Sequence, residues 1–297
     1  EYPEVLGTTA PPANKAELRT RGWEVSVKWN DRIGNDFSYD LGFILSDSQA
    51  EITKYENPSG TLSDYYVGQK IGEIWGYETE GFYQSDTDVQ NHADQSKLGA
   101  NWAPGDIMYK DLDGNKKINN GSNTLDDHGD LKVIGNTTPR YQYGITANMS
   151  YKNVYLSVFF QGIGKRDFWP SSQPFWPVAT QYYNTQKWFV TDSWSEDNRD
   201  AYFARPIARE TKNQQKQTKY LQDASYCRLK NLTVGYDFPK SWLSFLHVAK
   251  AGVYFSAENL FEFTNVKGAY DPEAAGKNGT MVYPFQRTYS FGLNVTF

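Results

Sequence analysis

The chain has 297 residues, with 30 Lys and Arg against 35 Asp and Glu, so its formal net charge is −5. This balance gives no basic surface of the kind that binds nucleic acid. The single cysteine excludes an internal disulfide framework, and three histidines argue against a catalytic or zinc cluster built on His or Cys. No apolar run reaches the roughly 18 residues that a transmembrane helix needs.

Two segments near the start of the chain alternate between apolar and polar residues. They cover residues 23–30 and 37–45, and only Ile44 breaks the pattern. Alternate side chains of a strand point to opposite faces. A short turn over residues 31–35 separates the segments, so together they predict a β-hairpin. The apolar side chains of the first segment are Trp23, Val25, Val27 and Trp29.

The clearest alternation runs over residues 141–151, where Tyr, Ile, Ala and Met face one way and polar or small residues the other. A two-residue turn, Lys152-Asn153, leads into a return strand. Roughly ten alternating residues is the length that a tilted strand needs to cross a bilayer. Later alternating segments lie at 231–236, 253–258 and 286–297, with a short helical turn predicted at 239–246. We expect seven or eight strands in all.

The apolar face of such strands has two possible environments, the core of a soluble β-sandwich or the hydrocarbon of a membrane. The predicted connections alternate in length: the turns near residues 31 and 152 are short, whereas segments 50–139 and 162–220 are long and polar. This asymmetry is typical of a bacterial outer-membrane β-barrel. Strand parity then turns one set of polar residues toward the barrel interior: Gln142, Asn148, Asn231, Glu258 and Asn294. The alternative is a soluble carbohydrate-binding β-sandwich module that uses Trp169 and Trp176.

An aromatic and proline-rich stretch lies in the second long segment. Aromatic rings stack on sugar faces or peptide side chains with little loss of entropy. We therefore predict a substrate or lid contact there, with self-packing of the loop as the alternative. The candidate residues are Trp169, Trp176, Tyr182, Tyr183 and Trp188.

The segment from residue 111 to 119 resembles the first part of a calcium-binding loop. Asp111, Asp113, Asn115 and Asn119 supply carboxylate and amide oxygens at alternate positions, the ligands that Ca²⁺ prefers. A turn held by its own side-chain hydrogen bonds is the alternative. No phosphate-binding loop or nucleophile motif is present, so we predict no catalytic residues and no other cofactor.

Several motifs resemble those of the SusC-like (SusC/RagA) TonB-dependent outer-membrane importers. They occur in the order found in that family and extend from about residue 106 to residue 297. In this sequence they are residues 105–115 (GDIMYKDLDGN), 139–144 (PRYQYG), 221–236 (LQDASYCRLKNLTVGY), 256–261 (SAENLF), 270–273 (YDPE) and 283–285 (YPF).

The resemblance implies an all-β fold, the carboxy-terminal strands of a 22-stranded antiparallel transmembrane barrel. Residues 1–297 would form one portion of that barrel domain, without the plug and the amino-terminal strands. The implied function is nutrient import across the Gram-negative outer membrane, with oligosaccharides or peptides as substrates. A SusD-like surface lipoprotein would act as a lid, and TonB would supply energy through the absent amino-terminal part. The terminal Phe297 would serve as the assembly signal for insertion into the lipid bilayer.

Overall fold

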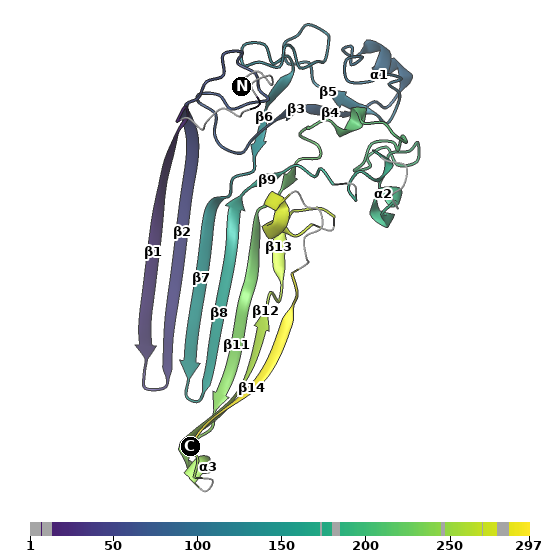
Figure 1. Cartoon of the computed structure of the whole chain (residues 1–297). Helices are drawn as coiled ribbons and strands as arrows, with labels where there is room; N and C mark the ends of the chain where they lie inside the picture. The colour runs from purple at the N-terminus through teal and green to yellow at the C-terminus, as the bar shows by residue number, and fades with distance from the viewer. Residues whose placement is uncertain are drawn as a thin grey trace.

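The computed structural model describes residues 7, 14–172, 174–179, 185–244, 247–268, 270–277 and 285–297. One eight-stranded antiparallel sheet contains all the long strands, in the order β1-β2-β7-β8-β11-β12-β14, with β13 paired to β11 (Figure 1). The expected antiparallel fold of seven or eight strands is confirmed. The strands are β1 (Glu17–Ile33), β2 (Phe37–Lys54), β7 (Arg140–Tyr151), β8 (Val154–Lys165), β11 (Tyr226–Asp237), β12 (Lys250–Glu258), β13 (Glu262–Thr264) and β14 (Thr288–Thr296).

Short and long connections leave opposite ends of this sheet (Figure 1). At the turn end, residues 34–36 join β1 to β2, residues 152–153 join β7 to β8, and helix α3 (Lys240–Leu243) lies between β11 and β12. The long segments after β2, β8 and β12 leave from the other end, called the loop end here. The first turn is shorter than the predicted 31–35, because Ile33 still pairs with Phe37 and Gly34 adopts φ +65°.

The strand register gives the sheet one polar and one apolar face, because residues directly opposite each other in neighbouring strands share a face. One row across the sheet is polar throughout: Asn30, Asp40, Asn148, Ser157, Thr233, Ser256 and Ser290. The row one residue away, on the opposite face, is apolar throughout: Trp29, Leu41, Ala147, Val158, Leu232, Ala257 and Tyr289.

The apolar face is uncovered. Val27, Trp29 and Phe291 are 55%, 59% and 84% exposed. In the described part of the chain, the two clusters of buried apolar side chains contain no residue of this sheet. The soluble β-sandwich would need the odd-numbered face of 141–151 to pack against a second sheet, yet Ile145 and Tyr151 are exposed. The alternative of a soluble carbohydrate-binding module is therefore wrong.

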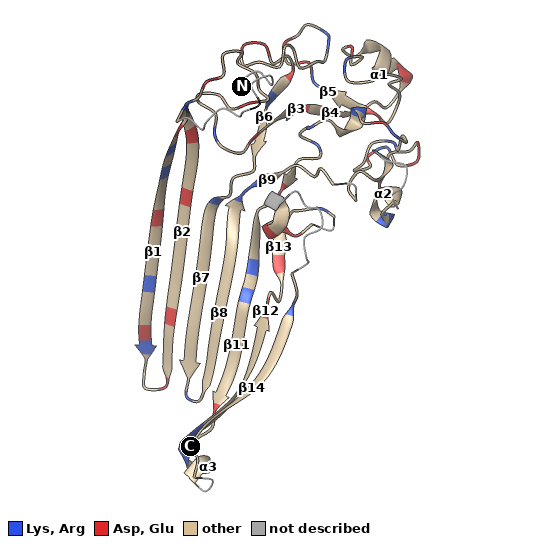
Figure 2. Cartoon of the chain, viewed as in Figure 1, with Lys and Arg blue, Asp and Glu red and all other residues tan. Residues whose placement is uncertain are grey.

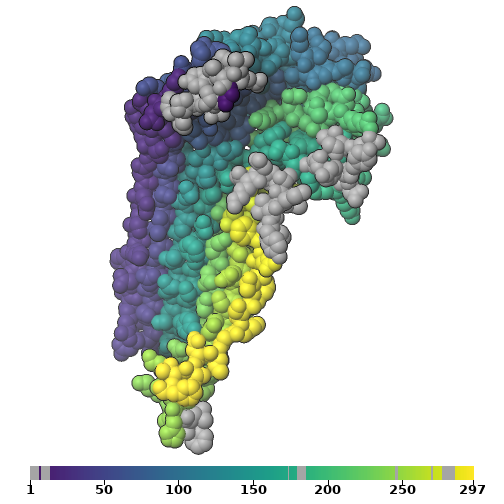
Figure 3. Space-filling model, in the orientation of Figure 1, coloured from purple at the N-terminus to yellow at the C-terminus, as the bar shows by residue number. Residues whose placement is uncertain are grey.

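The buried apolar side chains gather instead in the loops. Three two-stranded sheets form there, from β3 (Glu73–Tyr77) with β6 (Leu131–Asn136), β4 (Thr79–Phe82) with β5 (Ile107–Tyr109), and β9 (Asp167–Phe168) with β10 (Gln222–Asp223). Short helices α1 (Asp86–Asn91) and α2 (Lys187–Thr191) and 3-10 turns at Pro177–Ala179, Lys212–Gln214 and Pro272–Lys277 complete the loops. We call the larger cluster the loop core: Tyr77, Phe82, Ile107, Tyr109, Ile118, Phe175, Trp176, Phe189, Trp194, Ala201, Phe203, Ala204 and Tyr220. Figure 3 shows the loops as a continuous mass that projects to one side at the loop end.

Charged side chains avoid most of the central strands. Strands β7 and β8 each carry one charge, Arg140 and Lys165, at the residue nearest the loop end, and β14 carries none. Figure 2 shows most of the remaining charge in the loops and along β1 and β2. In the described residues we find no helix with the length and apolar character needed to traverse a membrane.

Candidate functional site

The polar face carries side chains that hydrogen-bond to one another across strands. The Asn148 amide donates to the Asp40 carboxylate at 3.1 Å, and the Ser157 hydroxyl donates to the Asn148 carbonyl oxygen at 2.7 Å. Nearer the turn end, the hydroxyls of Ser38 and Ser150 lie 2.8 Å apart. Because these bonds use only part of each group's capacity, the same side chains remain able to bind water or a polar solute.

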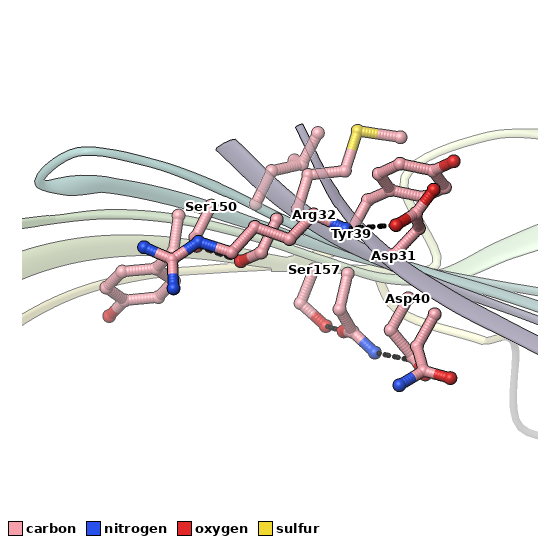
Figure 4. A pocket seen from close by; sticks show the side chains of 12 residues that line it. Asp31, Arg32, Tyr39, Asp40, Ser150 and Ser157 are labelled. Carbon is pink, nitrogen blue, oxygen red and sulfur yellow. Dashed lines mark hydrogen bonds between the residues drawn. The ribbon is translucent and has the colours of Figure 1, made fainter. Parts of the chain in front are cut away.

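A hollow of about 650 Å³ lies along this row at the turn end of β1, β2, β7 and β8. Figure 4 shows Asp40 and Ser157 on the same side of the sheet, and Asn148 links them through the two hydrogen bonds above. Charges of both signs line the hollow, with Arg32 and Asp40 on the polar face and Asp31 on the opposite face. Tyr39, Met149 and Leu156 also line it, so its lining is partly polar and partly apolar.

All five residues predicted to turn inward lie on the polar face. Asn231 pairs directly with Glu258, and Asn148 belongs to the polar row. Gln142 follows the parity of Asn148 along β7, and Asn294 pairs with Gly252 on the same face as Glu258. Asn231 is half-buried and the other four are exposed. The shared face is thus as predicted, while contact with a barrel interior stays a prediction.

A buried carboxylate, Asp106, joins three loop segments. It is fully buried and accepts two hydrogen bonds of 2.8 Å from the Arg205 guanidinium and one of 2.9 Å from the Asn213 amide. The Lys212 ammonium lies 2.9 Å away, and the Ala103 backbone N–H donates at 3.0 Å. Burial by itself would raise the pKa of Asp106, but Arg205, Asn213 and Lys212 outweigh it and hold the pKa below its ordinary value.

A second charge cluster centres on Arg228 of β11, on the polar face near the loop end. Arg228 is 2% exposed and pairs with Glu262 of β13, with Asp271 at 2.7 Å and with Glu273 at 2.6 Å. Lys230 also contacts Glu273, at 3.1 Å. The cluster ties the segment after β12 to the wall of the sheet. Every carboxylate of the cluster contacts Arg228, and Glu273 also contacts Lys230, so we interpret the cluster as a structural arrangement.

The predicted aromatic contact residues pack within the loops. Trp176 is 8% exposed in the loop core, and its indole N–H donates to a backbone carbonyl oxygen at 2.6 Å. Trp169 and Trp188 are partly buried against the same core. Tyr182 and Tyr183 lie outside the described residues. The packing of the three tryptophans matches the alternative of self-packing, and contact with a substrate or lid stays a prediction.

The acidic loop brings Asp111, Asp113 and Asp130 together, with one oxygen of each within 4.8 Å of the others. Hydrogen bonds already engage these groups: Asp111 and Asp130 each accept two backbone N–H bonds, and Asn115 donates to Asp113. Asn119 instead accepts from a nearby backbone N–H and donates to a carbonyl within the loop. Burial opposes ionisation of Asp111, but the backbone donors outweigh it and lower its pKa. Calcium binding stays a prediction.

The sequence pattern assigns no role to Asp106 or Arg228, although both lie in motifs that resemble those of the importer family. Both are single charged residues whose partners lie 34 to 107 positions away in the sequence. The only sequence signal for a role was that each charged residue lies directly beside an apolar one. Asp106 precedes Ile107, and Arg228 precedes Leu229. A charged residue directly beside an apolar one, as in Asp106-Ile107 and Arg228-Leu229, is compatible with a buried ion pair, but this pattern names no partner.

No protein-family model matches the chain. Over 321 aligned residues it is 29% identical to "TonB-dependent receptor P3" of Formosa agariphila, covering 99% of this chain and 30% of that protein. It is 25% identical to "TonB-dependent receptor SusC" of Bacteroides thetaiotaomicron, covering 96% and 27%. Among solved structures, the RagAB peptide transporter superposes with a TM-score of 0.70 at 21% identity, covering 100% and 31%. The chain spans about a third of the length of these curated relatives.

These relatives confirm the resemblance seen in the motifs, because the similarity extends over nearly all of the chain. The structural likeness shows that the sheet and its loops have the fold of the matched part of the RagAB structure. The matched proteins are named as receptors and importers, in agreement with the expectation that the chain is not an enzyme.

Proposed function

We propose that this chain, a relative of the SusC-like TonB-dependent receptors, forms part of the wall and the outer loops of a nutrient importer of the Gram-negative outer membrane. The observation that carries the proposal is the uncovered apolar face of a sheet whose opposite face is polar. Exposing such a face to water costs free energy, and extended apolar patches are accordingly rare on soluble monomers. Hydrocarbon imposes no such cost, so lipid is the environment that fits it.

Aromatic residues at two levels support a lipid belt on β1 and its neighbours. Trp23 and Trp29 flank Val25 and Val27 on the apolar face, and the Trp29 indole N–H donates to the Tyr39 hydroxyl at 3.3 Å. Trp and Tyr favour the two boundaries between hydrocarbon and water, since each has an apolar body and a polar tip. Beyond Trp23, the same face of β1 becomes charged, as expected where a strand leaves the membrane.

The polar face would line the import pathway, with Gln142, Asn148, Asn231, Glu258 and Asn294 in contact with water or substrate. In the described chain, β1 and β14 each pair with a neighbour on one side only. Their free edges would pair with the remaining strands of the same transporter, which would also hold the plug. Eight strands enclose too narrow a space for such a lumen and plug, so we assign residues 1–297 to one portion of a larger barrel domain.

The partners follow from the relatives. The RagAB structure is titled a peptide transporter, and one relative is SusC. By analogy, a SusD-like lipoprotein would cover the loop end, and TonB would supply energy through a part of the transporter outside this chain. An oligosaccharide or a peptide would be the substrate. Phe297, which is 91% exposed beside the apolar end of β14, would act as the assembly signal.

Two adjacent residues of β7 provide the test. Ala147 lies on the apolar face and Asn148 on the polar face, so a cysteine at either position samples one face only. With Cys227 replaced by serine, each single cysteine would carry a spin label in the full-length receptor in liposomes. We expect oxygen, which concentrates in lipid, to relax the label at 147, and a water-soluble nickel complex to relax the label at 148. Nickel access at 147 equal to that at 148 would refute the lipid-facing assignment.

A further inference from the structure

Two lysines share one aromatic ring in the loops. The Lys267 ammonium lies 4.2 Å from the centre of the Tyr202 ring, and the Lys219 ammonium lies 5.9 Å from the same centre. Lys219 also lies 4.3 Å from the centre of the Phe82 ring. Trp188 stacks on Tyr202 with ring centres 5.2 Å apart. Two positive charges from separate loop segments therefore meet at one aromatic cluster.

Neither ammonium has a carboxylate partner among the described residues. Six other lysines in the described chain lie within 4.0 Å of an acidic group, namely Lys15, Lys54, Lys110, Lys132, Lys212 and Lys230. Asp192 lies near Lys219 but is engaged elsewhere, because its two oxygens accept from the Tyr202 backbone N–H and, at 3.3 Å, from the Trp188 indole. Lys219 and Lys267 therefore place two like charges at one ring, with no described carboxylate within ion-pair distance of either.

The surroundings make this pair of charges unfavourable in the absence of an anion. Lys219 is half-buried, whereas Lys267 is exposed to solvent. Burial lowers the pKa of Lys219, and the charge of Lys267 lowers it further, against an opposing effect of Asp192 and Asp200. Contact with the ring faces offsets part of this cost, since a cation is attracted to an aromatic face. It does not remove the repulsion between the two ammonium groups.

We propose that Lys219 and Lys267 bind a carboxylate of the imported substrate as it passes the outer loops. An oxyanion between the two ammonium groups would relieve their repulsion and form charge-assisted hydrogen bonds with both. The backbone N–H of Lys267 donates to the Gln222 side chain, whose amide in turn donates to the Tyr202 hydroxyl at 2.6 Å. These bonds fix the segment that carries Lys267 relative to the ring. The inference rests on the proposed import function and narrows its substrate to an acidic one.

Calorimetry on the purified full-length receptor tests this proposal with two pairs of probes. Trigalacturonate and its methyl ester differ chiefly in the charge of a sugar substrate. Triglutamate and triglutamine, both N-acetylated and C-terminally amidated so that only the side chains can be charged, do the same for a peptide. We expect one acidic probe to bind and its neutral partner to bind at least about tenfold more weakly, as for a lost charge-assisted contact. The acidic probe that binds identifies the source of the carboxylate. Failure of both acidic probes, or equal binding of a neutral partner, overturns the proposal.

Variants separate a binding role from a packing role. The double variant Lys219→Met, Lys267→Gln keeps the aliphatic contacts and should weaken the acidic probe about tenfold or more without affecting the neutral one. Lys267→Arg keeps the charge and should restore most of the affinity. Lys152→Gln is the matched control, because Lys152 also lies over a tyrosine ring, that of Tyr151 at 5.3 Å, but at the turn end. Unchanged affinity in the double variant would mean that the lysines only cap aromatic rings.

The failure of one proposal can be told apart from the failure of the other. Spin-label accessibility at positions 147 and 148 does not depend on either lysine. If those labels report lipid on one face and water on the other while no acidic probe binds, only the carboxylate site is wrong. If an acidic probe binds but label 147 is reached from water, the site stands and the import function is wrong.

Discussion

Replacing Asp106 with asparagine tests whether one buried carboxylate holds the outer loops together. Its Oδ1 faces Arg205 and Asn213, and its Oδ2 faces Arg205, Lys212 and the Ala103 N–H. Whichever way the new amide turns, its NH₂ group meets at least two donors. Removing one partner of a buried ion pair costs about 3–5 kcal/mol. A loss of this size is a large part of the free energy that holds a small group of loops in place. We therefore expect Asp106→Asn to open the loop core while the strands of the sheet stay paired.

Hydrogen exchange followed by mass spectrometry measures this opening. At about 3–5 kcal/mol the exchange of amides in residues 101–109 should accelerate by roughly two to four orders of magnitude, while amides of β7 keep their protection. Asp126→Asn is the matched control, because Asp126 is exposed and belongs to the same run of loop acids. Equal exchange in the two variants would refute the role of Asp106.

The pH dependence of the same opening has a definite sign. The folded pKa of Asp106 is lowered, so its ionised form stabilises the loops fully above the unfolded value of about 3.9. This contribution is lost as the pH falls through the folded pKa. Wild type and Asp106→Asn should therefore differ at neutral pH and converge below about pH 4. A difference that persists at low pH would show that the asparagine acts through packing rather than through charge.

Three further substitutions or additions test other parts of the structure. Val27→Lys places a charge on the apolar face and should cost about 2–4 kcal/mol of stability in a bilayer, measured by folding into vesicles, whereas the neighbouring Ser26→Lys should be tolerated. Gly235→Ala would drive a methyl group into the ring of Tyr155 and cost about 1–3 kcal/mol by the same assay, and the cost should vanish in a Tyr155→Ala background. Adding Ca²⁺ to chelator-treated receptor should slow hydrogen exchange of the amides in residues 111–130, and Asp113→Asn should abolish this effect. If Ca²⁺ leaves the exchange unchanged, the acidic loop is a set of hydrogen-bonded turns and does not bind calcium.

The strands could be predicted because one face of each strand is apolar along much of its length, which gives the sequence a period of two. Alternation located β7 to within a residue, and the parity of Asn148 correctly gave its face. The same signal missed the loop-end halves of β1 and β2. Residues 17–22 and 46–54 are largely polar on both faces, so the period of two disappears although Arg19 still pairs with Glu51. A strand that leaves the membrane keeps its backbone pairing and loses its pattern.

The loop core could not be predicted for a different reason. Its members come from strands of three to five residues, from short helices and from irregular turns, which are too short to show any period. Ile107 and Phe203 belong to one cluster although 96 positions separate them in the sequence numbering. The glycines and asparagines between such residues make the segments look like solvated loops. The aromatic stretch around Trp176 was noticed, but its composition suits a buried cluster and a binding surface equally well.

The mean hydropathy of −0.70 is that of a polar chain, yet the protein has two separate groups of apolar side chains. One covers the outside of the sheet, and the other is the loop core, which shares no residue with the sheet. Most of a soluble protein's apolar side chains would be used in one core, so a change anywhere in that core would affect the whole. Under the proposed function the sheet would depend on lipid, and the loops would depend on their own packing and on Asp106. Because Val27 lies on the apolar face of the sheet and Asp106 lies in the loops, the effects of Val27→Lys and Asp106→Asn should add. Strong coupling between them would mean that loops and wall fold as one unit.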